Sequence, residues 1–257
     1  MDIDFEELDF RKTRLGELSL RRRKELTLGV QIFEVKLGDE FLMSSLFTEG
    51  EIALANIGLK ELEPGPVDVL VGGLGLGYTA LAVLEHSTVS SLLVVEAIPE
   101  VIEWHQRGLV PLGPKLTSDQ RCSFLCGDFF GLAQSPGLNP AHPAKRYHAI
   151  LVDIDHSPSH VLNPAHRHLY TTAGLQQLAQ HLHPGGVFAL WSNDPPEEAF
   201  LGLLSSVFTD ARAQVVKFHN PLQNRDASNT IYLAKSKKGT DPEVSPHISV
   251  VNLRLSC

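Results

Sequence analysis

Four acidic residues stand just after short apolar runs, where buried strands are expected to end. They are Glu96, Asp128, Asp153 and Asp194. Because the carboxyl ends of parallel strands meet at one edge of an open α/β sheet, and ligands bind at that edge, these side chains are expected to lie close together. Carboxylates that share one site repel one another. Their common position therefore predicts a polar or cationic ligand.

A glycine-rich turn precedes the first of these acids. Gly73, Gly75 and Gly77 follow an apolar run, and an apolar helical pattern begins directly after them. Glycine adopts backbone angles that other residues resist and lets a ligand approach the main chain. Glu96 comes 19 residues after Gly77, where a carboxylate at the tip of the next strand can accept both hydroxyls of a ribose. The lysine–threonine pair of a P-loop is missing, which argues against a triphosphate. The alternative is that the glycines only let helix and strand pack closely.

Three further residues are predicted to contact the ligand. Asp128 can accept a hydrogen bond from an exocyclic amine, and Phe129 beside it can lie against a ring. An aspartate before a helix is also a preferred N-cap, and the two roles are compatible. Ala97, next to Glu96, completes the predicted binding set.

Asp153 is the residue predicted to take part in chemistry, because a carboxylate at the end of the fourth strand would point at the reactive end of the ligand. His156 follows on the same loop and can act as a base near neutral pH; Tyr170 is a second candidate. His156 can equally make only a loop hydrogen bond, since the chain has 12 histidines. The histidines of this loop have no spacing typical of a metal site, and no metal is predicted.

From residue 67 onward, apolar runs alternate with helical patterns, which is typical of a parallel sheet covered by helices on both faces. Strands are expected near 68–72, 92–96, 122–126, 148–153 and 186–191, with two last strands at 213–218 and 230–234. Helices are expected near 77–86, 99–107, 128–134, 171–182 and 196–207.

The first 62 residues have a different pattern. Alternating runs at 15–20 and 30–35, with a return at 41–44, predict short antiparallel strands and a hairpin at Gly38-Asp39. A helix is expected from Thr48 to Leu59, with Thr48 as N-cap and Glu51 as its capping-box partner. The sequence thus predicts a β-rich region at 1–62, a cofactor-binding catalytic domain at 63–234, and a linker at 235–257 with an edge strand at 248–255.

Composition and charge limit the partners and the cellular compartment that the sequence predicts. The 257 residues carry a net charge of -8, which does not favour a nucleic-acid partner. Three cysteines, an odd and low count, favour a reducing and cytoplasmic environment. The acidic N-terminus is unlike a signal peptide, and no segment is apolar enough to span a membrane.

Taken together, these motifs resemble the spermidine synthase (polyamine aminopropyltransferase) family, within the Rossmann-like S-adenosylmethionine-dependent transferases. The resemblance runs from about Val67 to Pro196, about half of the chain. The matching segments are Gly73-x-Gly75-x-Gly77, Val95-Glu96 with Pro99 to Ile102, Gly127-Asp128, Tyr147 to Asp153, Leu169-Tyr170 and Leu182 to Val187. The resemblance implies a mostly parallel seven-stranded sheet with a small N-terminal β-rich extension. It also implies that Glu96 binds the ribose, that Asp128 binds the adenine amine, and that Asp153 is the catalytic aspartate.

Departures from the family pattern decide the order of the functional hypotheses. Leu76 replaces an aspartate of the glycine loop, and the stretch before the first parallel strand keeps Glu49 and Glu51 but lacks a Tyr-His pair. The first hypothesis is therefore a methyltransferase that uses S-adenosylmethionine on a small or amine-containing acceptor. The alternatives are an aminopropyltransferase that uses decarboxylated S-adenosylmethionine, and a non-catalytic cofactor-binding scaffold. An NAD-dependent dehydrogenase is a weaker fourth hypothesis. The sequence leaves open a homodimer formed through the N-terminal strands.

Overall fold

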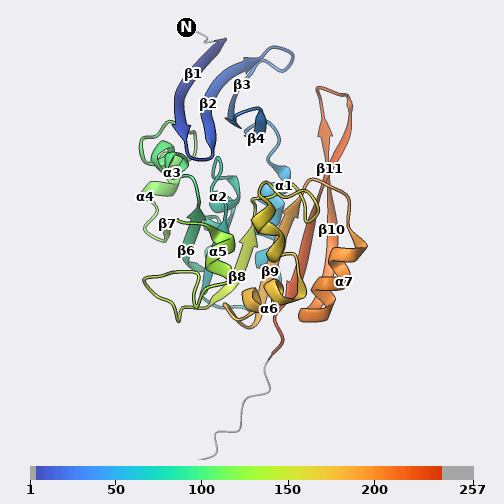
Figure 1. Ribbon diagram of the computed structural model, residues 1–257. Helices are drawn as coiled ribbons and strands as arrows, with labels where there is room; N and C mark the ends of the chain where they lie inside the picture. Colours follow the sequence, from blue (N-terminus) through green and yellow to red (C-terminus); the bar gives the residue numbers. More distant parts are fainter. Residues whose placement is uncertain (1–3, 239–257) are drawn as a thin grey trace, which may run out of the picture.

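A computed structural model describes residues 4–238 and shows two sheets (Figure 1). The first is a four-stranded antiparallel sheet in the order β1-β2-β3-β4. Its strands are β1 (Phe5–Thr13), β2 (Gly16–Glu25), β3 (Val30–Leu37) and β4 (Glu40–Ser44). It lies at the end of the molecule toward which the parallel strands point (Figure 1). This sheet is the β-rich N-terminal extension that the sequence predicts.

The second sheet has seven strands in the order β10-β11-β9-β8-β5-β6-β7. Its members are β5 (Val67–Gly72), β6 (Val89–Glu96), β7 (Cys122–Cys126), β8 (Tyr147–Val152), β9 (Leu182–Ser192), β10 (Thr209–Asn220) and β11 (Arg225–Lys235). Strands β5 to β9 are parallel to one another. Strand β11 pairs antiparallel with β9, and β10 pairs antiparallel with β11. The predicted Rossmann-like fold is confirmed, with its strands at the predicted positions.

Helices cover both faces of this sheet because the buried strands are apolar on both sides. In β5, Val69 and Val71 join one hydrophobic core, whereas Leu70 between them joins the other. The helices are α1 (Glu49–Lys60), α2 (Tyr78–Leu84), α3 (Pro99–Gln106), α4 (Gly113–Ser118), α5 (Phe129–Ala133), α6 (Thr172–Ala179) and α7 (Glu198–Val207), with a 3-10 helix η1 (Pro164–His168). Within residues 4–238, no helix combines the length and apolar composition needed to cross a membrane.

The structure differs from the sequence-based expectation at several elements. Strand β1, helix α4 and the helix η1 have no expected counterpart, and the last two strands are longer than predicted. The predicted capping box is wrong, because Thr48 makes no side-chain cap hydrogen bond. Glu51 lines a cavity instead. The edge strand predicted at 248–255 lies outside the described residues.

Candidate active site

A large cavity lies at the edge of the seven-stranded sheet where the parallel strands end. Its volume is about 1050 Å³. All of the predicted ligand contacts line it, together with two of the three predicted catalytic residues: Gly73, Gly75, Gly77, Glu96, Ala97, Asp128, Phe129, Asp153 and His156. Residues that are distant in the sequence thus meet at one edge, as the parallel topology requires. Tyr170 is not among the lining residues, and neither is Asp194, the fourth acidic residue expected at this edge, whose Oδ2 lies 2.7 Å from His160 Nδ1.

The three glycines of the turn all have positive φ angles, +95° at Gly73, +51° at Gly75 and +92° at Gly77. A Cβ added at Gly73 would meet the backbone carbonyl oxygen of Asp153, and one added at Gly77 would lie 2.6 Å from Leu116 Cδ1. The sequence suggests that glycine is needed so that a ligand can approach. The structure adds another reason, because at these positions the added atom would meet the protein itself. Gly73 thereby lets the loops after β5 and β8 touch.

Glu96 at the end of β6 is held by the loops around it. Its Oε2 accepts a hydrogen bond from the Leu74 amide at 2.9 Å, and its Oε1 accepts one from the Ile98 amide at 2.9 Å. Burial raises the pKa of this carboxyl, although the backbone amides around it oppose the shift. Glu96 is therefore fixed in orientation beside the glycine turn, with its remaining acceptor capacity available to a ligand in the cavity.

Asp128 and Phe129 occupy the start of α5. Asp128 is the N-cap, and its Oδ1 accepts a hydrogen bond from the Phe130 amide at 3.0 Å. The N-cap interpretation is confirmed, and it is compatible with ligand contact because Asp128 also lines the cavity. Phe129 is buried, and its ring packs so closely on Gly72 that a Cβ there would lie 2.9 Å from Cδ2.

Asp153 shares the cavity with a second carboxylate, Glu51 from the first turn of α1. Thr79 donates a hydrogen bond from Oγ1 to Asp153 Oδ2 at 2.6 Å. Burial raises the pKa of Asp153 despite this bond. Burial also raises the pKa of Glu51, and the nearby charge of Asp153 raises it further. Neither carboxylate forms an ion pair with a basic side chain of residues 4–238.

The other two predicted catalytic residues have hydrogen-bond partners other than Asp153. His156 Nε2 lies 2.9 Å from Glu40 Oε1 on β4. Tyr170 donates its hydroxyl to Asp155 Oδ2 at 2.8 Å. Asp155 is buried and also accepts from His166 Nδ1 at 2.7 Å, so this network braces the loop after β8. Neither His156 nor Tyr170 makes a hydrogen bond to Asp153 in the described part of the chain.

The sequence predicts no catalytic or binding role for many of the lining residues, including three large ones. Tyr78 opens α2, Trp191 stands near the end of β9, and Met43 reaches from β4 to Gly75, where a Cβ would lie 2.8 Å from its sulfur. Each belongs to an apolar stretch, so its residue type alone indicates core packing. Their place in the cavity depends on the position of α1 and of the four-stranded sheet, which no local pattern predicts.

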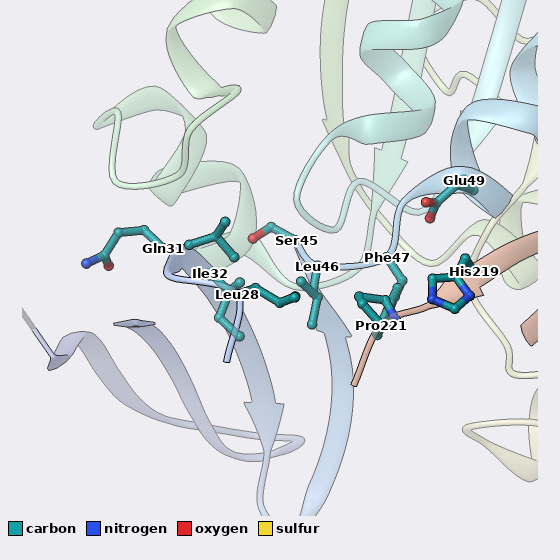
Figure 2. Close-up of a pocket in the computed structure, with 10 residues that line it drawn as sticks. Leu28, Gln31, Ile32, Ser45, Leu46, Phe47, Glu49, His219 and Pro221 are labelled. Carbon is teal, nitrogen blue, oxygen red and sulfur yellow. The ribbon is translucent and has the colours of Figure 1, made fainter. Parts of the chain in front are cut away.

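Figure 2 shows a second and smaller hollow, of about 390 Å³, between the N-terminal sheet, the start of α1 and the β10–β11 hairpin. Its lining combines apolar residues, Leu28, Ile32 and Phe47 among them, with polar ones, and His219 and Glu49 lie at one side. Phe47 also contacts a ring of the hairpin, with 5.8 Å between centroids. None of the predicted catalytic or ligand-binding residues lines this hollow, which marks the junction of the two sheets.

The part of the chain that carries the predicted site residues is similar to known proteins. The family model of the spermine/spermidine synthase domain matches residues 51–217, a range that contains every residue predicted for the site. Polyamine aminopropyltransferase 2 of Pseudomonas aeruginosa is 30% identical over 167 residues, covering 60% of this chain and 44% of the relative. The polyamine aminopropyltransferase of Bacillus mycoides is 28% identical over 152 residues, covering 58% of this chain and 49% of the relative. The matched region thus spans about half the length of these curated relatives or less.

Solved structures agree on the fold. The crystal structure of spermidine synthase from Thermotoga maritima superposes with a TM-score of 0.67 at 19% identity, over 92% of this chain and 74% of that one. A spermidine synthase in complex with the transition state analogue AdoDATO gives a TM-score of 0.68 at 19% identity, over 92% and 75% of the two chains. At this identity the likeness concerns the fold.

Proposed function

Because the chain belongs to the spermine/spermidine synthase domain family, we propose that it transfers an aminopropyl group from decarboxylated S-adenosylmethionine to an amine. The sequence motifs favour methyl transfer, with aminopropyl transfer as the alternative. The curated relatives are named for aminopropyl transfer, which supports the second hypothesis.

One observation carries the choice between the two cofactors. S-adenosylmethionine and its decarboxylated form differ in a carboxylate, so the second has only an ammonium at the end of its propyl chain. The Glu51–Asp153 pair lies in a partly dehydrated site, and neither carboxylate forms an ion pair with Arg14 or Arg167, two arginines that line the same cavity. Such a pair repels a carboxylate and attracts an ammonium. This favours the decarboxylated cofactor and an amine acceptor.

The residues of the cavity fit a nucleoside cofactor of this kind. Glu96 is fixed beside the glycine turn and would accept the ribose hydroxyls. Asp128 and Phe129 would contact the adenine. When bound, the cofactor supplies a sulfonium leaving group, so the protein mainly positions the reactants.

In the reaction, the acceptor nitrogen forms a bond to the propyl carbon next to sulfur, and the carbon–sulfur bond breaks with its electron pair going to sulfur. The acceptor must be a neutral amine to attack, so its ammonium proton has to be removed. The Asp153 carboxylate would accept that proton, because its raised pKa brings it closer to the amine in basicity. Glu51 would hold the second positive charge in the site. Holding the reactants in line supplies about 7–11 kcal/mol of the barrier in favourable cases.

The test is a product analysis by mass spectrometry with the two cofactors side by side and aliphatic amines as acceptors. Amine-dependent release of methylthioadenosine from the decarboxylated cofactor is the expected result. Formation of S-adenosylhomocysteine from S-adenosylmethionine, with no product from the decarboxylated cofactor, would overturn the proposal in favour of methyl transfer. Cofactor binding without any product would favour the scaffold hypothesis.

A further inference from the structure

Trp191 is one of the aromatic residues that line the cavity. It lies on β9, where it pairs with Ile231 of β11, and it lines the cavity together with Glu51 and Asp153. Its indole nitrogen is buried and has no hydrogen-bond partner in the described part of the chain. A buried N–H that lacks a partner is unusual and calls for an explanation.

The contacts behind the indole provide that explanation. Gly50, buried in the first turn of α1, is so close that an added Cβ would clash with Trp191 Nε1 and would lie 2.5 Å from Asn229 Oδ1. The nitrogen side of the ring is therefore pressed against the α1 backbone. The surface that Trp191 presents to the cavity is thus its carbon surface.

The neighbours of Gly50 connect this contact to the site. Glu51 follows Gly50 in the same turn, so the glycine that accommodates the indole is bonded directly to one of the two unpaired carboxylates. An indole face is the strongest aromatic surface for a cation, and two carboxylates stand in the same cavity. These groups suit an ammonium head group, and the indole limits the size of substituents near the ammonium nitrogen.

We propose that Trp191, held in place by its close packing on Gly50, selects the acceptor: it admits an unbranched primary amine to Glu51 and Asp153 and excludes amines that are substituted close to the nitrogen. This inference rests on the proposed amine acceptor. It concerns selectivity among amines, which the choice of cofactor does not determine.

The selectivity test compares 1,4-diaminobutane with its N-methyl and 1-methyl derivatives, using the decarboxylated cofactor. We expect Trp191→Ala to raise kcat/KM for the substituted amines relative to the parent amine by about tenfold or more, because a pocket wall discriminates groups of methyl size by that order. The KM for the cofactor should change by less than about threefold. Equal changes for all amines would overturn the proposal.

Gly50→Ala supplies the converse test. The added methyl group should push the indole into the cavity and raise the KM for 1,4-diaminobutane by about tenfold. The smaller ring of Trp191→Phe should relieve this effect in the double variant, a rescue that general destabilisation would not produce. Gly202→Ala is the matched control, because a Cβ at that helix position meets no atom within 4 Å. A Gly50→Ala effect that Trp191→Phe leaves unchanged would contradict the proposal.

A binding measurement separates this inference from the proposed reaction. The chain has two tryptophans, Trp104 and Trp191, so an emission change that the parent protein shows and Trp191→Phe lacks reports on Trp191. Titration with 1,4-diaminobutane in the presence of methylthioadenosine should change the indole emission, and the N-methyl derivative should do so only at higher concentration. If this occurs without turnover, the reaction fails and the selectivity proposal stands. Turnover of 1,4-diaminobutane without any change in emission would overturn the role of Trp191.

Discussion

Glu51 and Asp153 line the same cavity, and burial raises the pKa of both side chains. Thr79 orients Asp153 through a hydrogen bond at 2.6 Å, whereas no hydrogen bond from a side chain of residues 4–238 holds Glu51. At the residue scale, these contacts suggest different tasks, with Asp153 fixed for proton transfer and Glu51 available to a ligand. Replacing each carboxylate with its amide tests the role of Asp153 in turnover and the ionisation of Glu51.

Asp153→Asn should depress turnover by about 100-fold or more, because an amide cannot accept the proton of the attacking amine. Cofactor affinity should stay within about threefold, since the nucleoside contacts are unchanged. Initial rates and calorimetric titration measure the two quantities. Glu85→Gln is the control, an exposed carboxylate at the end of α2. Unchanged turnover in Asp153→Asn would remove this residue from the mechanism.

Glu51→Gln should change how stability depends on pH. A carboxyl whose pKa is raised by folding binds its proton more tightly in the folded state, so its contribution is present at low pH and is lost as pH rises through the raised pKa. The free energy of unfolding of the parent, relative to Glu51→Gln, should therefore fall between about pH 5 and about pH 8. Urea denaturation at both pH values measures it. A difference that grows with pH would show that the carboxylate is stabilised by folding.

Some site residues can be predicted from local sequence patterns, whereas the partners of others depend on the tertiary structure. The sequence predicts that Glu96, Asp128 and Asp153 line one site, because the ends of buried strands can be recognised from apolar runs and the parallel topology brings these ends together. His156 and Tyr170 follow Asp153 in the sequence. Their hydrogen-bond partners, Glu40 and Asp155, cannot be predicted from residue spacing. The roles of all these residues in binding and catalysis stay predictions.

At the scale of elements, the turn between β5 and α2 and the loop after β8 depend on each other. The Asp153 amide donates to the Gly72 carbonyl at 2.8 Å. Gly73, at φ +95°, leaves room for the Asp153 carbonyl. The glycine turn therefore positions the proposed catalytic aspartate in addition to forming the part of the cavity proposed to bind the nucleoside.

Gly73→Ala should lower the free energy of unfolding by about 2 kcal/mol or more, because the left-handed backbone strain adds to the clash with Asp153. Turnover should fall further than stability alone explains. Chemical denaturation and initial rates at a temperature where both proteins are folded measure the effects. Gly202→Ala, the same change in an exposed stretch of α7, should instead stabilise by up to about 1 kcal/mol. Equal effects at the two positions would contradict this account.

The sequence predicted the parallel strands of the large sheet well, because an apolar run bounded by turn residues is a strong local signal. Strand β1 was missed because its side chains are exposed or half-buried and many are charged, so no alternation stands out. Glu51 was assigned to a capping box because its spacing from Thr48 fits one. Only the position of α1 against the sheet shows that its carboxylate lines the cavity.

At the scale of the whole molecule, specific polar contacts join the N-terminal sheet to the large domain. The Trp104 indole, fully buried on α3, donates to Asp9 Oδ2 of β1 at 2.7 Å. Arg11 bridges to Glu103 of the same helix at 3.1 Å. Because β4 carries Met43 to the glycine turn, this docking also completes the cavity. A homodimer through the N-terminal strands stays a prediction.

Asp9→Ala should cost about 1–3 kcal/mol of stability, because it leaves a buried indole N–H without a partner. It should also weaken cofactor binding by loosening the contact of Met43 with the turn. Thermal denaturation and calorimetry measure the two effects. Glu7→Ala, an exposed position on the same strand, should change neither. A loss of stability without any loss of cofactor affinity would show that the sheet stabilises the fold without shaping the cavity.

The close packing of Gly50 against Trp191 also restricts the order in which this chain can diverge. Any side chain at position 50 would collide with the indole, so a larger residue there can be accepted only after Trp191 has been replaced by a smaller one. Descendants of this sequence that gain a bulky residue in that turn must therefore pass through an intermediate with an enlarged cavity. Such an intermediate would be permissive for new substrates before it became selective again.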